Sequence, residues 1–268
     1  MITIIIVVYK SNIKKLNNIL KKIGNKYEII LIDNSYNYDF SKINLPKKVK
    51  IIRSQNIGNG AAINLGIKYA KTPYAIYFDI DVSFDKNLIK KLLSKAIQIK
   101  KFGILLPNNS KFKKTGEIIE RYELEAPIML FNIKKLKKIG FFDEKIFLYF
   151  EETDLFFKCK KNNIKVLVLS NIIIKHIRSS SISQYSDKDD KILYLRKWHY
   201  MWSMFYFYKK NFNYFFGINK TFFFLLKDII KLLIFIFLLN KKESFIRINR
   251  ISGLLASYLL LKSYKRVL

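Results

Sequence analysis

The chain has 268 residues, half of them hydrophobic, and its 50 Lys and Arg outnumber 20 Asp and Glu to give a net charge of +30. It can therefore bury a full core, as expected for one α/β domain of ordinary size with an appendage. The charge favours a polyanionic partner, namely nucleic acid, a phosphorylated substrate or an anionic membrane. The single cysteine, Cys159, excludes an internal disulfide and a cysteine-based zinc site, and it indicates a reducing compartment.

The amino-terminal stretch MITIIIVVYKSN predicts a strand followed by a helix. The apolar run from Ile4 to Val8 has the length of a strand, and the stretch lacks a basic leader and a small-residue cleavage site. Ser11 or Asn12 can cap the helix that follows. Its apolar positions fall on one stripe: Ile13, Leu16, Leu20 and Ile23. We therefore expect no signal peptide and a catalytic part in the cytoplasm.

Two more strands and a glycine-rich turn follow. Residues 28–35, EIILIDNS, predict a buried strand ending in Asp33, and residues 49–53 predict a short third strand. Residues 55–70 then form a glycine-rich turn that runs into a helix, whose amides and positive end favour phosphate. The turn resembles a GxGxxG fingerprint, but Ile63 replaces the third glycine, so a dinucleotide-binding fold is the less favoured interpretation.

The stretch YAIYFDIDVSFD is the most informative part of the sequence. Tyr74 to Phe78 predict a strand buried on both faces, with Asp79 and Asp81 where the strand ends. Alternation along an extended chain points both carboxylates the same way, and with Asp33 three acids gather at one edge of the sheet. Oxygen-only ligation suits Mg²⁺ or Mn²⁺, with phosphate oxygens completing the shell. A solvated turn after the strand is the alternative.

The middle of the chain continues the alternation of strands and helices. A helix over about residues 86–99 and a strand over 102–107 complete a pattern that predicts a parallel sheet covered by helices. Residues 111–123 predict a polar hairpin with its turn at Thr115 and Gly116. A strand over 124–131 and a short helix over 133–140, stopped by a glycine, return the chain to the core.

Three acids stand at the head of the next predicted helix. Glu151, Glu152 and Asp154 follow an aromatic run, and acids in a first helical turn are ordinarily structural. Glu152 beside bulky apolar residues is also a candidate general base with a raised pKa, suited to activating a sugar hydroxyl. Residues 166–176 predict a last strand pair ending in His176, where a lone histidine is more often a satisfied polar residue than a ligand.

The last third of the sequence interleaves basic and aromatic side chains, as in YLRKWHYMW. Residues 191–268 hold 15 Lys and Arg against two acidic residues, a composition that suits the interface of an anionic membrane. The most apolar run, residues 221–239, approaches the length of a membrane span but is interrupted by Lys227, Asp228 and Lys231. We expect an in-plane amphipathic helix, with a buried core hairpin as the alternative.

Five motifs together resemble the family 2 glycosyltransferases, in order and spacing, over roughly residues 1–210, and most of all the rhamnosyltransferase-type branch. The motifs are LIDNS at 31–35, NIGNGAAINLGIKYA at 56–70, FDIDV at 78–82, IGFFDEKIFLYFEETDL at 139–155 and KHIRSSS at 175–181. The resemblance implies a GT-A nucleotide-diphospho-sugar transferase fold, with a Rossmann-like mixed sheet covered by helices, and inversion at the anomeric carbon.

The resemblance also implies roles for the acids and the turn of the first half. Asp33 would hold the nucleotide base, and Asn56 and Gly58 would line the nucleotide pocket. Asp79 would face the ribose or donor sugar and also contribute to the metal site. Asp81 would bind the divalent ion, and it is the safer ligand because relatives often carry Asn-x-Asp there.

In the second half, Glu151, Glu152 and Asp154 fall in the family's Glu-Asp-x-Asp-Leu box and are the candidate catalytic residues. Glu152 takes the usual base position, one methylene longer than the family's aspartate, and Glu151 is its rival. His176 matches a histidine that reaches the metal or diphosphate in some relatives. The segment 125–127, Glu-Ala-Pro, stands where the family often has Ser-Gly-Ala, on the acceptor side of the pocket.

We therefore expect a GT-A catalytic domain over residues 1–186 and a basic, aromatic-rich amphipathic helical tail over 187–268. The expected enzyme is a metal-dependent, inverting glycosyltransferase that uses a nucleotide-diphosphate sugar. The expected acceptor is saccharide or lipid-linked, in cell-surface polysaccharide synthesis, at the inner face of the cell membrane and without nucleic acid. The alternatives are a catalytically inactive membrane-associated scaffold of the same fold and a basic nucleic-acid-binding protein.

Overall fold

The computed structural model describes residues 1–109, 116–176 and 190–266, and it divides into two compact units. The first unit comprises Met1–Asp143 and Glu152–Gln184, and the second comprises Glu144–Glu151 and Tyr185–Leu268. The short segment Glu144–Glu151 therefore belongs with the carboxyl-terminal part of the chain. The domain boundary expected near residue 186 falls outside the described residues and stays a prediction.

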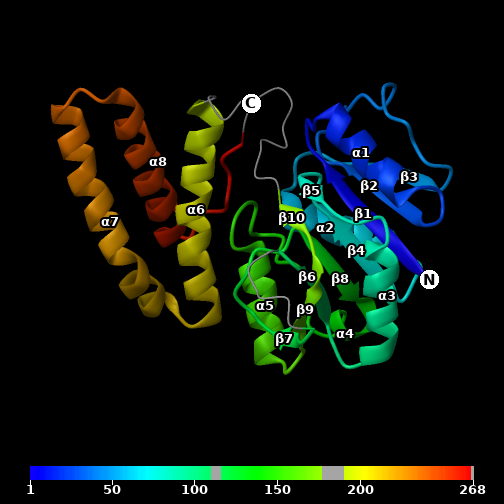
Figure 1. The fold of residues 1–268 in the computed structure, drawn as a ribbon. Helices are drawn as coiled ribbons and strands as arrows, with labels where there is room; N and C mark the ends of the chain where they lie inside the picture. The colour runs from blue at the N-terminus through cyan, green and yellow to red at the C-terminus, as the bar shows by residue number, and fades with distance from the viewer. Residues whose placement is uncertain (110–115, 177–189, 267–268) are drawn as a thin grey trace. The chain divides into compact units, whose positions relative to one another are not determined.

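The first unit is built on an eight-stranded mixed sheet (Figure 1). Its strands are β1 (Ile2–Val8), β2 (Glu28–Asp33), β3 (Val49–Arg53), β4 (Tyr74–Phe78), β6 (Ile104–Asn108), β7 (Ile118–Glu120), β8 (Ile128–Asn132) and β9 (Val166–Ile173). They lie in the order β3-β2-β1-β4-β8-β6-β9-β7. The pairs β1–β2, β1–β4 and β2–β3 are parallel, so four strands end at one edge. The predicted α/β fold with a mixed sheet is confirmed.

One strand in the middle of the sheet departs from the parallel pattern that the strand and helix alternation favours. β8 runs antiparallel to both β4 and β6. Parallel neighbours need a crossover connection, usually a helix, to carry the chain back to the same end of the sheet. The described residues between β6 and β8 contain no helix, so the chain returns along β8 in the opposite direction.

Helices cover both faces of the sheet because the strand side chains alternate between two cores. On one face, α1 (Ile13–Ile23) and α3 (Leu88–Ile99) pack with Ile4 and Ile6 of β1. On the other face, Ile5 packs with α2, α4 and α5. Their bounds are α2 Asn59–Tyr69, α4 Ile133–Leu136 and α5 Glu151–Lys161. Asn12, one of the two expected caps of the first helix, accepts a bond from the Lys15 backbone N–H.

The polar hairpin predicted over residues 111–123 stays a prediction, because its first strand lies outside the described residues. The described strand in this stretch, β7, pairs antiparallel with β9. Thr115, half of the expected turn, lies outside the described residues. The alternation of side chains over residues 118–120 is too short to predict the partner strand. That strand, β9, lies about fifty residues further along the chain.

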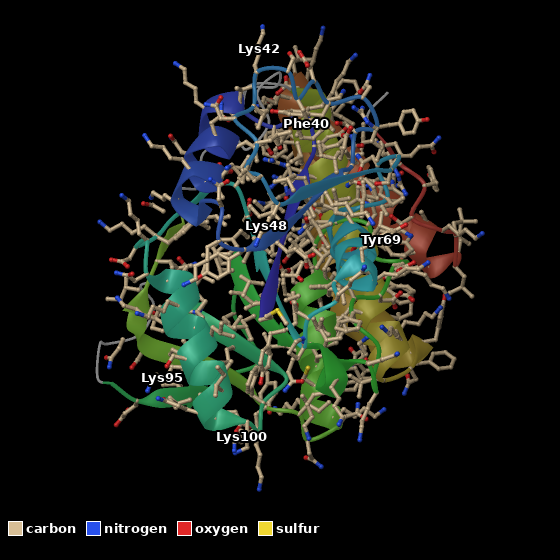
Figure 2. The ribbon with its side chains drawn as sticks, turned by 90° about the vertical axis from the view of Figure 1, so that its right-hand side faces the viewer. Phe40, Lys42, Lys48, Tyr69, Lys95 and Lys100 are labelled. Atoms are coloured by element: carbon tan, nitrogen blue, oxygen red, sulfur yellow. The ribbon has the colours of Figure 1, made fainter. Side chains whose placement is uncertain are left out.

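Exposed lysines carry much of the positive charge of the first unit. Lys42 and Lys48 lie in the loop before β3, and Lys95 and Lys100 lie on α3 and at its end (Figure 2). Salt screens such exposed charges over about 8 to 10 Å. These charges therefore act mainly on groups within about that distance of them.

The second unit contains three long helices, α6 (Asp190–Asn211), α7 (Tyr214–Phe237) and α8 (Lys241–Tyr258), which pack side by side (Figure 1). Met201, Met204 and Phe205 of α6 form a core with Leu254 of α8. Over the described ranges of the chain, no helix combines the length and the apolar character needed to cross a membrane.

Asp228, which interrupts the apolar run of α7, is an internal anchor. Its side chain is buried, with Oδ1 accepting from Arg247 Nη1 at 3.1 Å and Oδ2 from Arg250 Nε at 2.7 Å. Both arginines lie on α8. A buried carboxylate needs such partners, because an unpaired charge inside a protein is strongly destabilising. The interruption in the apolar run therefore belongs to the packing of α7 against α8.

His199 of α6 is a second buried polar group of this unit. One ring nitrogen, Nε2, lies 2.8 Å from the Lys265 carbonyl oxygen, and Nδ1 lies 3.1 Å from Ser263 Oγ. Burial lowers the pKa of His199 to about 4, and the neighbouring positive charges of Arg266 and Lys265 oppose protonation further. The bond to the Lys265 carbonyl acts in the opposite direction but is outweighed.

We expect the second unit to lose stability as pH falls from about 6.5 towards about 4. The unfolded chain takes up a proton at the ordinary histidine pKa, whereas the folded unit resists it, so acid favours unfolding. The loss should reach about 2 kcal/mol at about pH 5. Both tryptophans of the chain, Trp198 and Trp202, lie on α6, so urea unfolding followed by tryptophan fluorescence reports on this unit.

The control is His199→Gln, which keeps hydrogen-bonding groups but does not titrate in this range. Its free energy of unfolding should change less between about pH 7 and about pH 5 than that of the wild type. Equal changes in both proteins would show that other groups cause the acid sensitivity.

Candidate functional site

The carboxyl end of β2 forms a tightly bonded loop around Asp33. The side chain is fully buried, and Oδ1 accepts from the Ser35 backbone N–H at 3.0 Å and from Ser35 Oγ at 2.8 Å. Oδ2 accepts from the Tyr38 backbone N–H at 3.0 Å and lies 3.4 Å from Arg53 Nη1. Both oxygens therefore shape the loop, and a nucleotide base would have to share or replace one of these partners.

Asn34 connects this loop to the glycine-rich turn. Its Oδ1 accepts from the Ile57 backbone N–H at 3.0 Å, and its Nδ2 donates to Asn56 Oδ1 at 3.2 Å. Gly58 stands just before α2 with a φ of 90°, a backbone conformation that glycine adopts without a steric penalty. The structure thus brings Asp33, Asn56 and Gly58 together at the edge where the four parallel strands end.

Gly60, in the first turn of α2, has a packing role. A Cβ atom at this position would lie 3.0 Å from Cβ of Phe142, which is closer than nearly all such contacts. The missing side chain lets the start of α2 lie against Phe142. The glycine-rich stretch therefore serves both the turn conformation and close packing.

Asp79 and Asp81 follow the end of β4, as predicted. The Asp79 backbone N–H donates to the Pro127 carbonyl at 2.8 Å, and the Asp81 backbone N–H donates to Asp79 Oδ1 at 3.4 Å. Asp81 is buried, and its Oδ1 lies 2.5 Å from Nζ of Lys15, which reaches it from the first turn of α1. A cationic group therefore already contacts the aspartate that was expected to bind the metal.

This donor set fits a divalent ion in charge and in atom type. The two acids offer carboxylate oxygens, which Mg²⁺ and Mn²⁺ prefer, and the Lys15 ammonium marks the position of a positive charge against Asp81. Among the described residues, no group of three or more His, Cys, Asp and Glu side chains is arranged to hold a metal. Phosphate oxygens of a bound donor would have to supply further ligands.

The backbone of His176 lies close to Asp79 and Asp81, although the residues are far apart in the sequence. It belongs to β10 (Lys175–His176), which pairs antiparallel with β5 (Val82–Ser83), and it stands opposite Val82, the residue after Asp81. The strand pairing thus brings the predicted metal-site histidine to the end of β4. Its side chain is outside the described part of the structure.

Glu152 lies at the head of α5 and is only partly exposed. Burial raises the pKa of its carboxyl, and the negative charges of Asp79 and Glu125 raise it further, while a backbone hydrogen bond acts in the opposite direction. Glu152 therefore lies close enough to Asp79, and to Glu125 of the acceptor-side segment, for their charges to act on its carboxyl. A carboxyl whose pKa is raised in this way is suited to take a proton from a hydroxyl group.

The other two acids of the motif occupy different surroundings. Glu151 is buried, and its negative charge is one of the causes that raise the pKa of Tyr149, after burial itself. Asp154 is fully buried one turn further along α5. Of the three candidates, Glu152 is the one that is partly exposed, and the charge of Asp79 acts on its carboxyl, which favours it over its rival Glu151.

Two residues of this site, Asn34 and Lys15, were not predicted from the sequence. Asn34 is part of the quoted LIDNS motif, and its place directly after Asp33 at a strand end is a signal that could have identified it. Lys15 gave no such signal, because a lysine on the polar side of a helix is ordinarily solvated. Its 66-residue separation from Asp81 hides their contact.

The sheet topology, the glycine-rich turn and the acids at the end of β4 define a GT-A fold of the kind found in nucleotide-sugar transferases. The model of Glycosyl transferase family 2 matches residues 3–161, more than half of the chain. The chain therefore belongs to the family 2 glycosyltransferases. A search of curated proteins finds no match.

Solved structures share this fold at low sequence identity. GalNAc-T7, solved with UDP, GalNAc and Mn²⁺, is 15% identical with a TM-score of 0.57; the match covers 78% of this chain and 50% of that one. TarS 1–349 from S. aureus, in complex with UDP-GlcNAc, is 16% identical with a TM-score of 0.52, over 97% and 92% of the two chains. Mannosyltransferase PcManGT from Pyrobaculum calidifontis, in complex with GDP-Man and Mn²⁺, is 10% identical with a TM-score of 0.57, over 96% and 86%. The chain spans half the length of the GalNAc-T7 chain, and these identities show the fold alone.

Proposed function

We propose that this protein transfers a sugar from a nucleotide-diphosphate donor to a hydroxyl group, with inversion at the anomeric carbon. The observation that supports this most is the position of Glu152, partly exposed at the head of α5, where the charges of Asp79 and Glu125 act on its carboxyl. It brings a candidate base to the acids that were expected to face the donor. Family membership supports the same class of reaction.

In the proposed reaction the acceptor oxygen bonds to the anomeric carbon as the bond from that carbon to the diphosphate oxygen breaks. Glu152 takes the acceptor proton, and the nucleoside diphosphate leaves with the bonding electrons. When bound between Asp79 and Asp81, a divalent ion would stabilise the negative charge of the leaving group. Asn56 and Gly58 are the proposed nucleotide-side residues, with Asp33 holding the loop beside them.

The test is a panel of nucleotide-diphosphate sugars, screened by thermal shift with Mn²⁺ present and then assayed for release of nucleoside diphosphate. Stabilisation by one donor, with release that needs a divalent ion, supports the proposal. Hexosyl and rhamnosyl donors belong in the panel, because the sequence motifs favour the rhamnosyltransferase-type branch. Binding of a donor without any turnover would favour the inactive scaffold. No donor binding together with tight, salt-sensitive binding of nucleic acid would favour the nucleic-acid-binding alternative.

We further propose that the helical tail attaches the protein to an anionic membrane, so that the acceptor is lipid-linked or part of a surface polysaccharide. α7 presents an exposed apolar surface, which we call the outer face of α7. It consists of Phe215, Phe222, Phe223, Leu226, Ile230, Leu233 and Phe237, all exposed and recurring on one side of the helix. Lys220, Lys227 and Lys231 lie beside it at spacings of seven and four residues, as in helices that bind at a charged lipid interface.

Anionic vesicles should therefore bind the protein more tightly than neutral vesicles. Phe223→Asp combined with Leu233→Asp should abolish most sedimentation with vesicles, because the changes place charges on the face expected to enter the lipid. Replacing the three lysines by Gln should remove mainly the salt-sensitive part of binding, about 1 kcal/mol for each charge near the surface. The measurement is cosedimentation over a range of salt concentrations.

Ile97→Asp is the matched control, since Ile97 is an exposed apolar residue on α3, a helix of the first unit. It should sediment like the wild type. If the wild type stays in the supernatant with anionic vesicles at low salt, the tail has another role. Dimerisation that is lost in the same Asp variants would then assign the outer face of α7 to a second copy of the chain.

A further inference from the structure

The turn that enters α5 has an unfavourable backbone conformation. Tyr149 has a φ of 65° and Phe150 a φ of 68°, directly before the helix that starts at Glu151. A Cβ atom makes the left-handed region unfavourable, and two bulky aromatic residues in succession are unusual there. Across residues 1–109, 116–176 and 190–266, no other two consecutive non-glycine residues have positive φ.

Such a conformation persists only where the surroundings hold it. Helix α6 supplies the contacts. Ser203 Oγ donates a hydrogen bond of 2.9 Å to the Leu148 carbonyl, just before the turn. The Tyr200 ring lies edge-on to Tyr149, with centroids 5.7 Å apart, and at the same distance from the ring of Phe150.

Phe147 and Phe150, at the two ends of the segment 147–150, also contact residues of the second unit. The ring of Phe147 lies 4.7 Å from the ring of His199, and the Arg266 guanidinium lies 3.7 Å from the Phe147 centroid. Phe150 also packs against Phe207, with centroids 5.7 Å apart. Every residue named in these contacts belongs to the second unit. The carboxyl-terminal helices therefore fix the backbone up to Glu151, and the next residue in the chain is Glu152.

We propose that Tyr200 and Ser203 are positioning residues for Glu152, acting through the strained turn at Tyr149 and Phe150. The inference rests on the proposed function, which assigns Glu152 as the base. It gives the helical tail a role in the chemistry that is separate from membrane attachment. If the turn relaxes to ordinary backbone angles, the first turn of α5 changes direction and the Glu152 carboxylate is displaced from its productive position.

The test compares α6 variants that contact the turn with matched variants that do not. Tyr200→Ala removes the two ring contacts, and its control is Tyr194→Ala, on the same helix, whose ring contacts Phe245 instead. Ser203→Ala removes one hydroxyl, and its control is Ser257→Ala, a buried serine that donates to the Trp202 carbonyl at the same distance of 2.9 Å. Each variant is assayed for kcat, for KM of the donor and for melting temperature.

Tyr200→Ala should lower kcat by a factor approaching about 10², the loss that a small misplacement of a catalytic group can cause. Ser203→Ala should lower it in the same direction, and the donor KM should stay near the wild-type value in both. Tyr200→Phe keeps the ring and should restore kcat. The control variants should keep kcat even where their melting temperature falls as much.

Glu152→Gln separates failure of this inference from failure of the proposed function. Wild-type turnover in Glu152→Gln would overturn the assignment of the base. If Glu152→Gln is inactive while Tyr200→Ala and Ser203→Ala keep the kcat of their controls, the positioning role is wrong. Should Tyr200→Ala not fold, Ser203→Ala decides the question, because it removes a single atom beyond Cβ.

Discussion

Glu152→Gln should bind the donor with unchanged affinity and turn over more slowly by a factor of about 10² to 10⁴, the usual effect of removing a positioned base. The amide keeps the size of the side chain but cannot accept the acceptor proton. Calorimetry gives the donor affinity, and initial rates of nucleoside diphosphate release give the turnover. Glu151→Gln is the control, since Glu151 is buried beside Tyr149 and should keep most activity. An inactive Glu151→Gln together with an active Glu152→Gln would reverse the two roles.

The pH dependence of the reaction offers an independent check on Glu152. A base with a raised pKa is protonated at acidic pH, so kcat/KM should fall on the acidic side at a higher pH than the ordinary glutamate value of about 4.3 would give. Glu125→Gln removes one of the two negative charges that raise this pKa. The acidic limb of the pH profile of kcat/KM should then move to lower pH. A limb that does not move would indicate that another group controls it.

Asp81→Asn should weaken Mn²⁺-dependent donor binding more than Asp79→Asn. Asp81 is nearly buried and already holds a cation, so the amide replaces a charged ligand at the centre of the expected metal site. The loss of Mn²⁺-dependent donor affinity should exceed the roughly 10- to 100-fold loss of metal affinity that follows removal of an outer-shell partner. Calorimetry with Mn²⁺ and with EDTA measures it. Tight donor binding that EDTA does not affect would contradict the metal requirement.

Lys15 provides a companion variant for this experiment. Because its ammonium contacts Asp81 at 2.5 Å, it should compete with a divalent ion for that carboxylate. Lys15→Met should therefore tighten Mn²⁺ binding a few-fold, in line with the value of about 0.2 to 1 kcal/mol for a partly exposed ion pair. Lys91→Met is the control, because Lys91 pairs with Asp85 at 3.9 Å on an exposed surface. Weaker Mn²⁺ binding in Lys15→Met would mean that the lysine supports the metal site.

Local sequence patterns predicted most strands and helices of the first unit, because buried strands and amphipathic helices leave clear periodicities. The run from Tyr74 to Phe78 is the clearest case, and the strand that follows it in the sheet was found as well. The direction of β8 was not predictable from such patterns, since an antiparallel strand in a sheet core is as apolar as a parallel one. The role of Asp228 was hidden for a similar reason, because its arginine partners lie on another helix.

Three acids of the candidate site were predictable from their positions at strand ends. Asp33, Asp79 and Asp81 have that position, and the topology brings their strands to one edge. Adjacent residues on a helix differ only in the direction in which they point. The motif favoured Glu152 over Glu151 by its place in the box, and the surroundings of Glu152 in three dimensions give an independent reason for the same preference. The contact between Lys15 and Asp81 also required the fold, because it joins the start of one helix to the end of a distant strand.

The antiparallel direction of β8 has a consequence for how such a transferase can diversify. Phe78 at the end of β4 stands opposite Ile128 at the start of β8, and the Asp79 backbone N–H bonds to the Pro127 carbonyl. The bond between Asp79 and Pro127 is thus made by main-chain atoms. Side chains before β8, such as Glu125, can therefore be exchanged without removing this main-chain bond to the donor-side segment. A new acceptor preference could then arise by mutation in one short loop while the donor machinery is inherited intact.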